Sequence, residues 1–205
     1  MKMKQYLLRI KSFYREGYSR DLFITCVAFA ALLLISFVIG LLRQDLAANI
    51  MDWFGRQIMQ TGVIEEDGSF HVVGLFYHNA QAMTLALLSG FIPFLYFSAL
   101  HLGTNSMLIG LFAAVYINEG NSLLVYLAGI LPHGIFEIPA LLLSIACSIH
   151  LCRAVTDYCR TRKKGTVSHA IRGILPVYLC IILPLVLIAA LVEAYITPAI
   201  LQAIL

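Results

Sequence analysis

Residues 72–118 read VVGLFYHNAQAMTLALLSGFIPFLYFSALHLGTNSMLIGLFAAVYIN and contain no Asp, Glu, Lys or Arg. A helix needs about 20 apolar residues to cross the ~30 Å hydrocarbon layer of a membrane, so this stretch is long enough for two crossings. The core of a soluble domain does not require so long an uncharged run. The stretch therefore predicts two membrane-spanning helices, with the chain reversing its direction between Gly90 and Gly103.

The rest of the chain is also poor in charge. Charged residues make up 12% and hydrophobic residues 60% of the 205, whereas roughly a quarter of a soluble domain is charged. Leu22–Leu42 is uncharged, and two further long stretches carry a single charge each, Glu137 and Glu193. We therefore predict an all-α fold, a polytopic transmembrane helical bundle of about five spans that forms one domain over residues 21–205.

The distribution of Lys and Arg predicts the orientation of this bundle. Six of these residues lie in residues 1–20, two in residues 43–71 and six in residues 153–172. Because loops rich in Lys and Arg stay in the cytoplasm, the first and third segments are expected inside and the second outside. The N-terminus is then cytoplasmic, residues 43–71 form an outer loop, residues 153–172 form a basic inner loop, and the C-terminus is outside.

The first 20 residues are expected to form a basic interfacial helix, whose apolar face meets membrane lipid and whose cations meet anionic headgroups. A solvated basic tail is the alternative. The apolar block that follows is about 21 residues long, which exceeds the 7 to 15 of a signal peptide, so we expect it to be retained. The five cysteines include no Cys-x-x-Cys pair and predict free thiols.

Two prolines and a glycine interrupt the next apolar stretch near mid-membrane, in Pro132-His133-Gly134 and at Pro139. They predict a broken span, which is tolerated at that depth only against protein or a wet cavity. His133 and Glu137 are four residues apart and would share a helix face. They predict a proton- or ion-responsive site or a polar latch between helices; alternatively, Glu137 caps backbone N–H groups at the break. Two ligands are too few for zinc, so we expect no metal site.

Three further polar features lie in apolar surroundings. Asn79 shares a helical stripe with small residues and predicts close helix packing, within the chain or in a homo-oligomer. Asn105 precedes Gly110 in a small, polar patch that could line a contact. Glu193 is expected either at the outer interface, where water would solvate it, or paired with a polar group of an inner helix.

The order of these elements resembles the stage II sporulation protein M family. An Asn-containing span, an Asn-x-x-x-x-Gly element, a Pro-His-Gly-x-x-Glu-x-Pro-Ala element and an Ala-Ala-x-x-Glu-Ala-x-x-Thr-Pro element follow one another over roughly residues 70–200. Ser106 departs from the family pattern, which usually has Gly after the Asn. The resemblance marks these residues as the candidate site: Asn79, Asn105, Gly110, Pro132, His133, Gly134, Glu137, Pro139, Glu193 and Pro198.

The resemblance implies a five- or six-span protein of the bacterial plasma membrane without known catalytic activity. The family's namesake acts in engulfment of the forespore, in a complex with two membrane-anchored peptidoglycan-degrading proteins. Relatives also occur in bacteria and archaea that do not sporulate. We therefore expect a membrane scaffold whose partners are other membrane proteins, possible further copies of the chain included, and no nucleic acid.

Two other functions are weighed against the scaffold. A transporter or permease-like subunit would use His133 and Glu137 as a polar mid-membrane site. An intramembrane enzyme would need a second acid or base near them, for which His78 and Glu193 are the candidates. The sequence contains none of the nucleophile, phosphate-binding or dinucleotide-binding motifs, so we predict that the protein is not an enzyme and uses no cofactor.

Overall fold

The computed structural model describes residues 17–59 and 71–204, and these residues form helices joined by short turns, with no strand among them. The elements are α2 Ser19–Leu42, α3 Gln44–Met59, α4 Val72–Leu88, η2 Ser89–Phe91, α5 Ser98–Asn118, α6 Leu123–Thr161, α7 Thr166–Val177, η3 Tyr178–Ile182, α8 Leu183–Leu191, η4 Val192–Ile196 and α9 Thr197–Ile204. The all-α fold predicted from the low charge is therefore confirmed.

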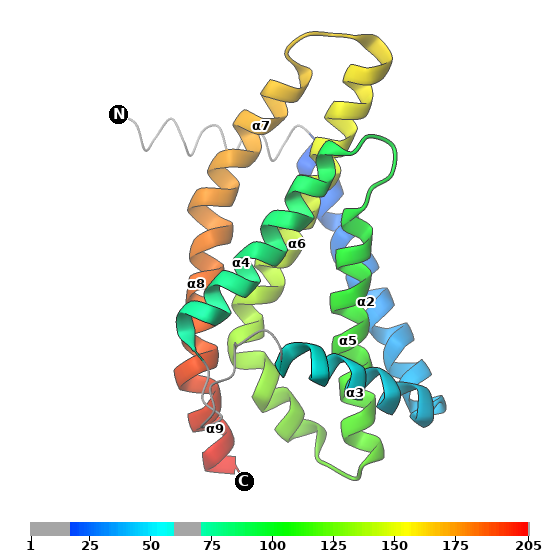
Figure 1. Cartoon of the computed structure of the whole chain (residues 1–205), viewed down its shortest axis with the longest axis vertical. Helices are drawn as coiled ribbons and strands as arrows, with labels where there is room; N and C mark the ends of the chain where they lie inside the picture. The colour runs from blue at the N-terminus through cyan, green and yellow to red at the C-terminus, as the bar shows by residue number, and fades with distance from the viewer. Residues whose placement is uncertain (1–16, 60–70, 205) are drawn as a thin grey trace.

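The long helices run along one axis and form a bundle (Figure 1). Within the described part of the chain, four helices are long and apolar enough to cross a membrane: α2, α5, α6 and the continuous helix of α7 to α9, Thr166–Ile204. The fifth expected span, α4, has 17 residues and is shorter than the others. It lies along the same bundle and leads through η2 into the turn before α5, so the chain reverses within the expected interval, between Gly90 and Gly103.

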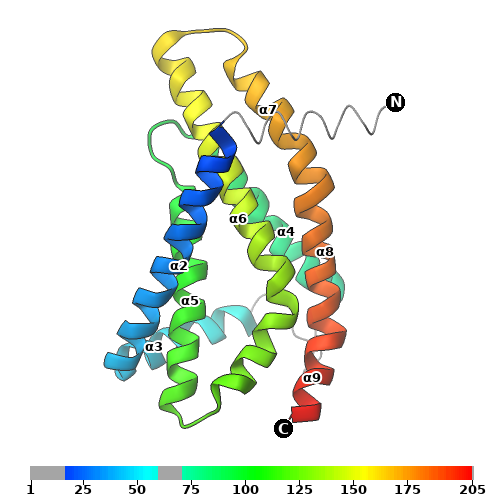
Figure 2. The same ribbon diagram turned by 180° about the vertical axis from the view of Figure 1, so that it is seen from behind.

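Helices α2 and α5 lie side by side (Figure 2) and approach each other closely because small residues face one another. A side chain on Gly110 would collide with Ser36 and with the carbonyl of Leu33 in α2, and one on Gly40 would meet the Cβ atom of Ala114 at 2.6 Å. Without a Cβ atom at these two positions, the backbones can pack directly against each other.

Helix α6 continues through both of its prolines, from Leu123 to Thr161. Figure 2 shows that it bends in its lower half and does not separate into two pieces. This corrects the expected break at Pro132–Pro139. Each proline removes one N–H donor and displaces the carbonyl four residues earlier, which bends a helix while the turns on either side keep their hydrogen bonds.

The two expected loops are largely helical. Within residues 43–71, the segment 44–59 is the helix α3, which lies across the lower part of the bundle (Figure 1), while residues 60–70 lie outside the described residues. Helix α3 forms because one of its faces is apolar: Ala47 is buried with Leu111 and Val115 of α5.

The expected basic loop is also shorter than residues 153–172. Helix α6 ends at Thr161 and α7 begins at Thr166, so the turn comprises residues 162–165 alone. Half of the six cations of this segment lie in the turn, and the other three, Arg153, Arg160 and Arg172, lie on the two helices. The interfacial helix expected in residues 1–20 lies, up to residue 16, outside the described residues.

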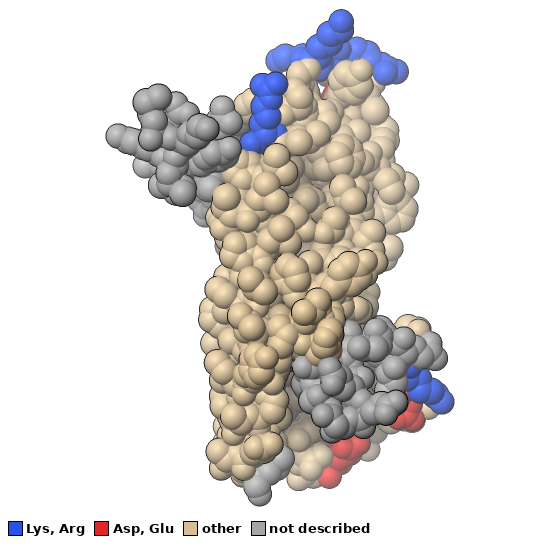
Figure 3. All heavy atoms as spheres, turned by 60° about the vertical axis from the view of Figure 1, so that its left-hand side comes forward, with Lys and Arg blue, Asp and Glu red and all other residues tan. Residues whose placement is uncertain are grey.

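Charge gathers at the two ends of the bundle, and the surface between them is almost free of it on the face shown in Figure 3. Lys and Arg dominate the end at which α6 meets α7, which we call the basic end. Large apolar side chains are exposed between the ends; Phe23, Leu34 and Leu100 are each more than 60% exposed. Such a surface is stable in lipid rather than in water, because its apolar side chains favour hydrocarbon and its helices pair most of their backbone polar groups internally.

Candidate functional site

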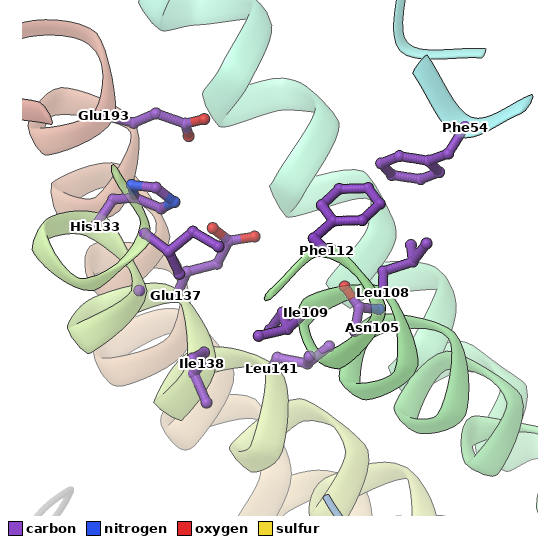
Figure 4. Close-up of a pocket in the computed structure, with 12 residues that line it drawn as sticks. Phe54, Asn105, Leu108, Ile109, Phe112, His133, Glu137, Ile138, Leu141 and Glu193 are labelled. Carbon is purple, nitrogen blue, oxygen red and sulfur yellow. The ribbon is translucent and has the colours of Figure 1, made fainter. Parts of the chain in front are cut away.

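Three ionisable side chains from two helices meet inside the bundle. His133 and Glu137 lie one turn apart on α6, and Glu193 reaches them from η4. Figure 4 shows the three side chains pointing toward one another, and their potential ligand atoms all lie within 4.8 Å. The structure thus places Glu193 with an inner-helix polar group, which is one of the two alternatives that the sequence left open.

The position of Glu193 depends on a local change in helix geometry. Residues Val192–Ile196 form a π-helix, and the backbone N–H of Thr197 donates to the carbonyl of Val192, five residues earlier. Pro198 follows directly, and its ring would clash with the carbonyl of Ala194 in a regular α-helix. The wider π turn relieves this clash and rotates Glu193 toward α6.

A threonine orients the histidine ring. The Nδ1 atom of His133 lies 3.4 Å from the Oγ1 atom of Thr197, and this hydroxyl in turn donates to the carbonyl of Val192 at 3.3 Å. Because Nδ1 is engaged on this side, Nε2 is the ring nitrogen that is available to the two carboxylates.

The three side chains border a cavity of about 340 Å³. Asn105 of α5 lines it on the opposite side, and Phe54 of α3 and Phe112 of α5 lie at its edge (Figure 4), with ring centroids 5.5 Å apart. At ~30 Å³ for each water molecule, the cavity has room for several waters or a small solute. The site is therefore a cavity between the helices of an apolar bundle that water or a small solute can fill.

The cavity lacks a positive partner for its two carboxylates. No Lys or Arg of the described chain lines it, and neither Glu137 nor Glu193 makes a hydrogen bond or ion pair with another described residue. Two carboxylates that face each other inside an apolar bundle are stabilised by a proton or a cation between them. The arrangement is therefore suited to binding a positive charge.

The other residues singled out from the sequence are distributed over the bundle. Gly110 packs against α2, away from the cavity, and the side chain of Asn79 is half-buried on α4 and forms no hydrogen bond with the described residues. His78, also on α4, is exposed and does not border the cavity, so it is not the second acid or base for His133. Gly134 is buried and borders the cavity beside His133.

A second polar cluster, at the basic end, was missed by the sequence reasoning. Asp21 of α2 is fully buried and accepts a hydrogen bond from the guanidinium of Arg153 in α6, while Nδ1 of His150 lies 3.7 Å from its other oxygen. The only signal in the sequence was the position of Asp21, an acid between Arg20 and the apolar stretch that begins at Leu22. This ion pair joins α2 to α6.

Tyr18 lies next to this ion pair and forms a further link between α2 and α6. Its hydroxyl donates to the carbonyl of Leu143 at 3.0 Å. Burial raises the pKa of Tyr18 well above its ordinary value, so the hydroxyl keeps the proton that it donates at neutral pH.

Together, the fold and the site define a multi-pass α-helical membrane protein with an ionisable cluster inside its bundle. The chain belongs to the stage II sporulation protein M family, whose family model matches residues 22–198. The match includes α2 and α3, which lie before the motifs noted in the sequence.

A further relative comes from an archaeon. The chain is 33% identical to an uncharacterized protein of Methanocaldococcus jannaschii over 132 residues, which are 64% of this chain and 73% of the relative. No solved structure matches the chain.

Proposed function

We propose that the chain is a non-enzymatic membrane scaffold that holds partner proteins at the outer face of the plasma membrane. The family to which it belongs supports this role, and the partners that the family resemblance implies are membrane-anchored, peptidoglycan-degrading proteins. Whether those partners act in sporulation or in another kind of cell-wall remodelling depends on the organism, because relatives occur in cells that do not sporulate.

The observation that carries the proposal is the two-sided character of α3. Its buried face packs on α5 through Ala47, and Phe54 contacts Phe112 edge to face. Its other face carries exposed side chains: Trp53 is 59% exposed, with the exposed Arg56 nearby along the helix. Exposed Trp and Arg side chains on a rigid helix are typical anchors of protein interfaces.

The proposed orientation puts α3 outside the cell. The positive-inside rule assigns the basic end to the cytoplasm, and α3 lies at the other end (Figure 1). A partner with its catalytic domain in the cell wall would approach from that side.

Purification of the tagged chain from its own organism in mild detergent tests this proposal. We expect wall-degrading proteins to copurify with the wild type and to be lost with Trp53→Ala. Tyr77→Ala is the matched control, because Tyr77 of α4 is an aromatic residue of similar exposure (66%) outside α3. Failure to recover such a partner with the wild type, or equal recovery with both variants, would contradict the proposal.

A second candidate function is transport, and the cavity beside His133 and Glu137 is the observation that favours it. Transporters commonly place their binding sites near mid-membrane, at irregular helices. If the chain transports a cation, proteoliposomes should show a flux that Glu137→Gln reduces at least tenfold and that Glu119→Gln, in the exposed turn after α5, leaves unchanged. Absence of any flux would eliminate this function.

A further inference from the structure

We propose that His133, Glu137 and Glu193 form a binding site for a divalent transition-metal ion such as Zn²⁺, which would bridge α6 and η4. The sequence spacing offered two ligands, and the fold adds the third. Three protein ligands with one open coordination position are a common arrangement for zinc bound by His and carboxylate groups. The open position would face the cavity of about 340 Å³.

The donor atoms decide which class of ion fits. One imidazole nitrogen and two carboxylates suit Zn²⁺ and neighbouring divalent ions of the first transition row. Ca²⁺ takes six to eight oxygen ligands and Mg²⁺ takes oxygen ligands in an octahedron, so a histidine ligand disfavours both. The two carboxylates would also neutralise the ion, so that no net charge is buried in the bundle.

The distances are compatible with binding after small side-chain movements. The ligand atoms lie within 4.8 Å of one another, whereas ligands of a tetrahedral zinc ion are about 3.5 Å apart. Rotation of the two flexible Glu side chains into the cavity between them can close this gap without moving a helix.

A hydrogen bond that would orient His133 toward such an ion is already present. Metal-binding histidines usually hold their other ring nitrogen with a hydrogen bond, which fixes the direction of the ring. Here Thr197 holds Nδ1 of His133 at 3.4 Å and leaves Nε2 toward the carboxylates (Figure 4). Asn105, across the cavity, makes one hydrogen bond through its Nδ2 atom, to the carbonyl of His101, so its Oδ1 atom is available to a water on the metal.

The lack of a counter-charge for Glu137 and Glu193 among the described residues is an independent indication that a cation binds there. Acids inside a membrane are expensive and normally have a partner, yet Glu137 and Glu193 have none among the described residues. A divalent cation would supply the missing charge to both at once.

Zinc titration of the purified full chain in lipid nanodiscs tests the proposal, with calorimetry as the readout. We expect one equivalent of Zn²⁺ to bind and to raise the midpoint of thermal unfolding, because a ligand that binds only the folded state stabilises it. Co²⁺ should bind in the same place and show the visible absorption of a four-coordinate site.

Single variants identify the ligands. Glu193→Gln and His133→Gln should each weaken Zn²⁺ binding at least 100-fold, and Thr197→Val, which removes the hydroxyl that contacts His133, about 10- to 100-fold. The matched controls are Glu119→Gln and His78→Gln, which alter exposed residues of the same types away from the cavity and should leave the affinity unchanged. Helical content measured by circular dichroism verifies that each variant is folded.

Two results would overturn the proposal. One is a wild-type chain that binds no Zn²⁺ at micromolar concentration, which would leave the two carboxylates to share a proton. The other is Zn²⁺ binding that the controls weaken as much as the ligand variants do, which would place the ion on surface histidines.

Discussion

Asp21 illustrates how one side chain can fix the relation between two helices. It is fully buried in α2, and its ionic partner Arg153 belongs to α6, 132 positions later in the chain. Removing one member of a buried ion pair typically costs ~3–5 kcal/mol, because the other charge remains without compensation. The guanidinium is 32% exposed, so water would screen part of this loss.

We therefore predict that Asp21→Asn lowers the free energy of unfolding by about 2 kcal/mol. The measurement is the midpoint of denaturation in detergent, followed by the loss of helical signal. Asp45→Asn is the control, since the pair of Asp45 with Arg43 is exposed on both sides and exposed pairs contribute little. Equal midpoints for the two variants would show that the Asp21 pair does not hold α2 to α6.

The sequence predicted the members of the intramembrane site better than their arrangement. His133 and Glu137 could be placed on one face because their spacing of four matches the helical period. The partner of Glu193 stayed open, since its direction depends on a π turn that no local pattern specifies. Asp21 was missed because the sequence alone does not say which helices touch.

At the scale of helices, small residues set the distance between α2 and α5. Gly110 faces Ser36 and the backbone of α2, whereas Gly103, two turns earlier on the same helix, has nothing within 4 Å of an added Cβ atom. Gly110→Ala should therefore separate the two helices and destabilise the protein by ~1–3 kcal/mol, the usual effect of overpacking.

Gly103→Ala provides the comparison for this prediction, because it makes the same chemical change in α5. We expect it to leave stability unchanged or to raise it by a few tenths of a kcal/mol, since Ala favours a helix over Gly. Thermal unfolding of both variants in the same detergent is the measurement. If the two variants unfold together, close packing at Gly110 is not what joins α2 and α5.

The other irregular elements, which are the bend in α6 and the π turns η3 and η4, all lie next to prolines. The prolines of α6 predicted a broken span, but the bundle accommodates them as a bend in a continuous helix. In the last helix, η3 and η4 each end two residues before a proline, Pro184 and Pro198. The sequence indicates where such irregularities occur, while the packing around them decides whether the helix bends, widens or stops.

Replacing Pro198 tests the origin of the second π turn. Pro198→Ala removes the clash with the carbonyl of Ala194, so η4 should return to a regular α-helix and Glu193 should rotate away from α6 by about 100°, the angle of one residue. We expect cross-linking between cysteines at positions 133 and 193 to fall at least fivefold in this background. Unchanged cross-linking would mean that tertiary packing, and not the proline, maintains the π turn.

For the whole molecule, charge distribution was the most informative feature of the sequence. The uncharged runs correctly predicted the helical bundle and the reversal between Gly90 and Gly103, because bilayer solvation admits few alternatives. The ends of the bundle were less predictable. The segment of helix α3 was expected to be a loop. This expectation was wrong because the helix is stabilised by packing of its apolar face on α5, which the sequence does not reveal.

The central claim is a bundle that places its basic end in the cytoplasm and α3 outside. Single cysteines at Lys164, in the turn before α7, and at Gln57, exposed on α3, can be introduced after replacement of the five native cysteines. A membrane-impermeant maleimide should label Gln57→Cys in intact cells stripped of their wall, and Lys164→Cys only in inverted membrane vesicles. Labelling of both positions from the same side would contradict the account.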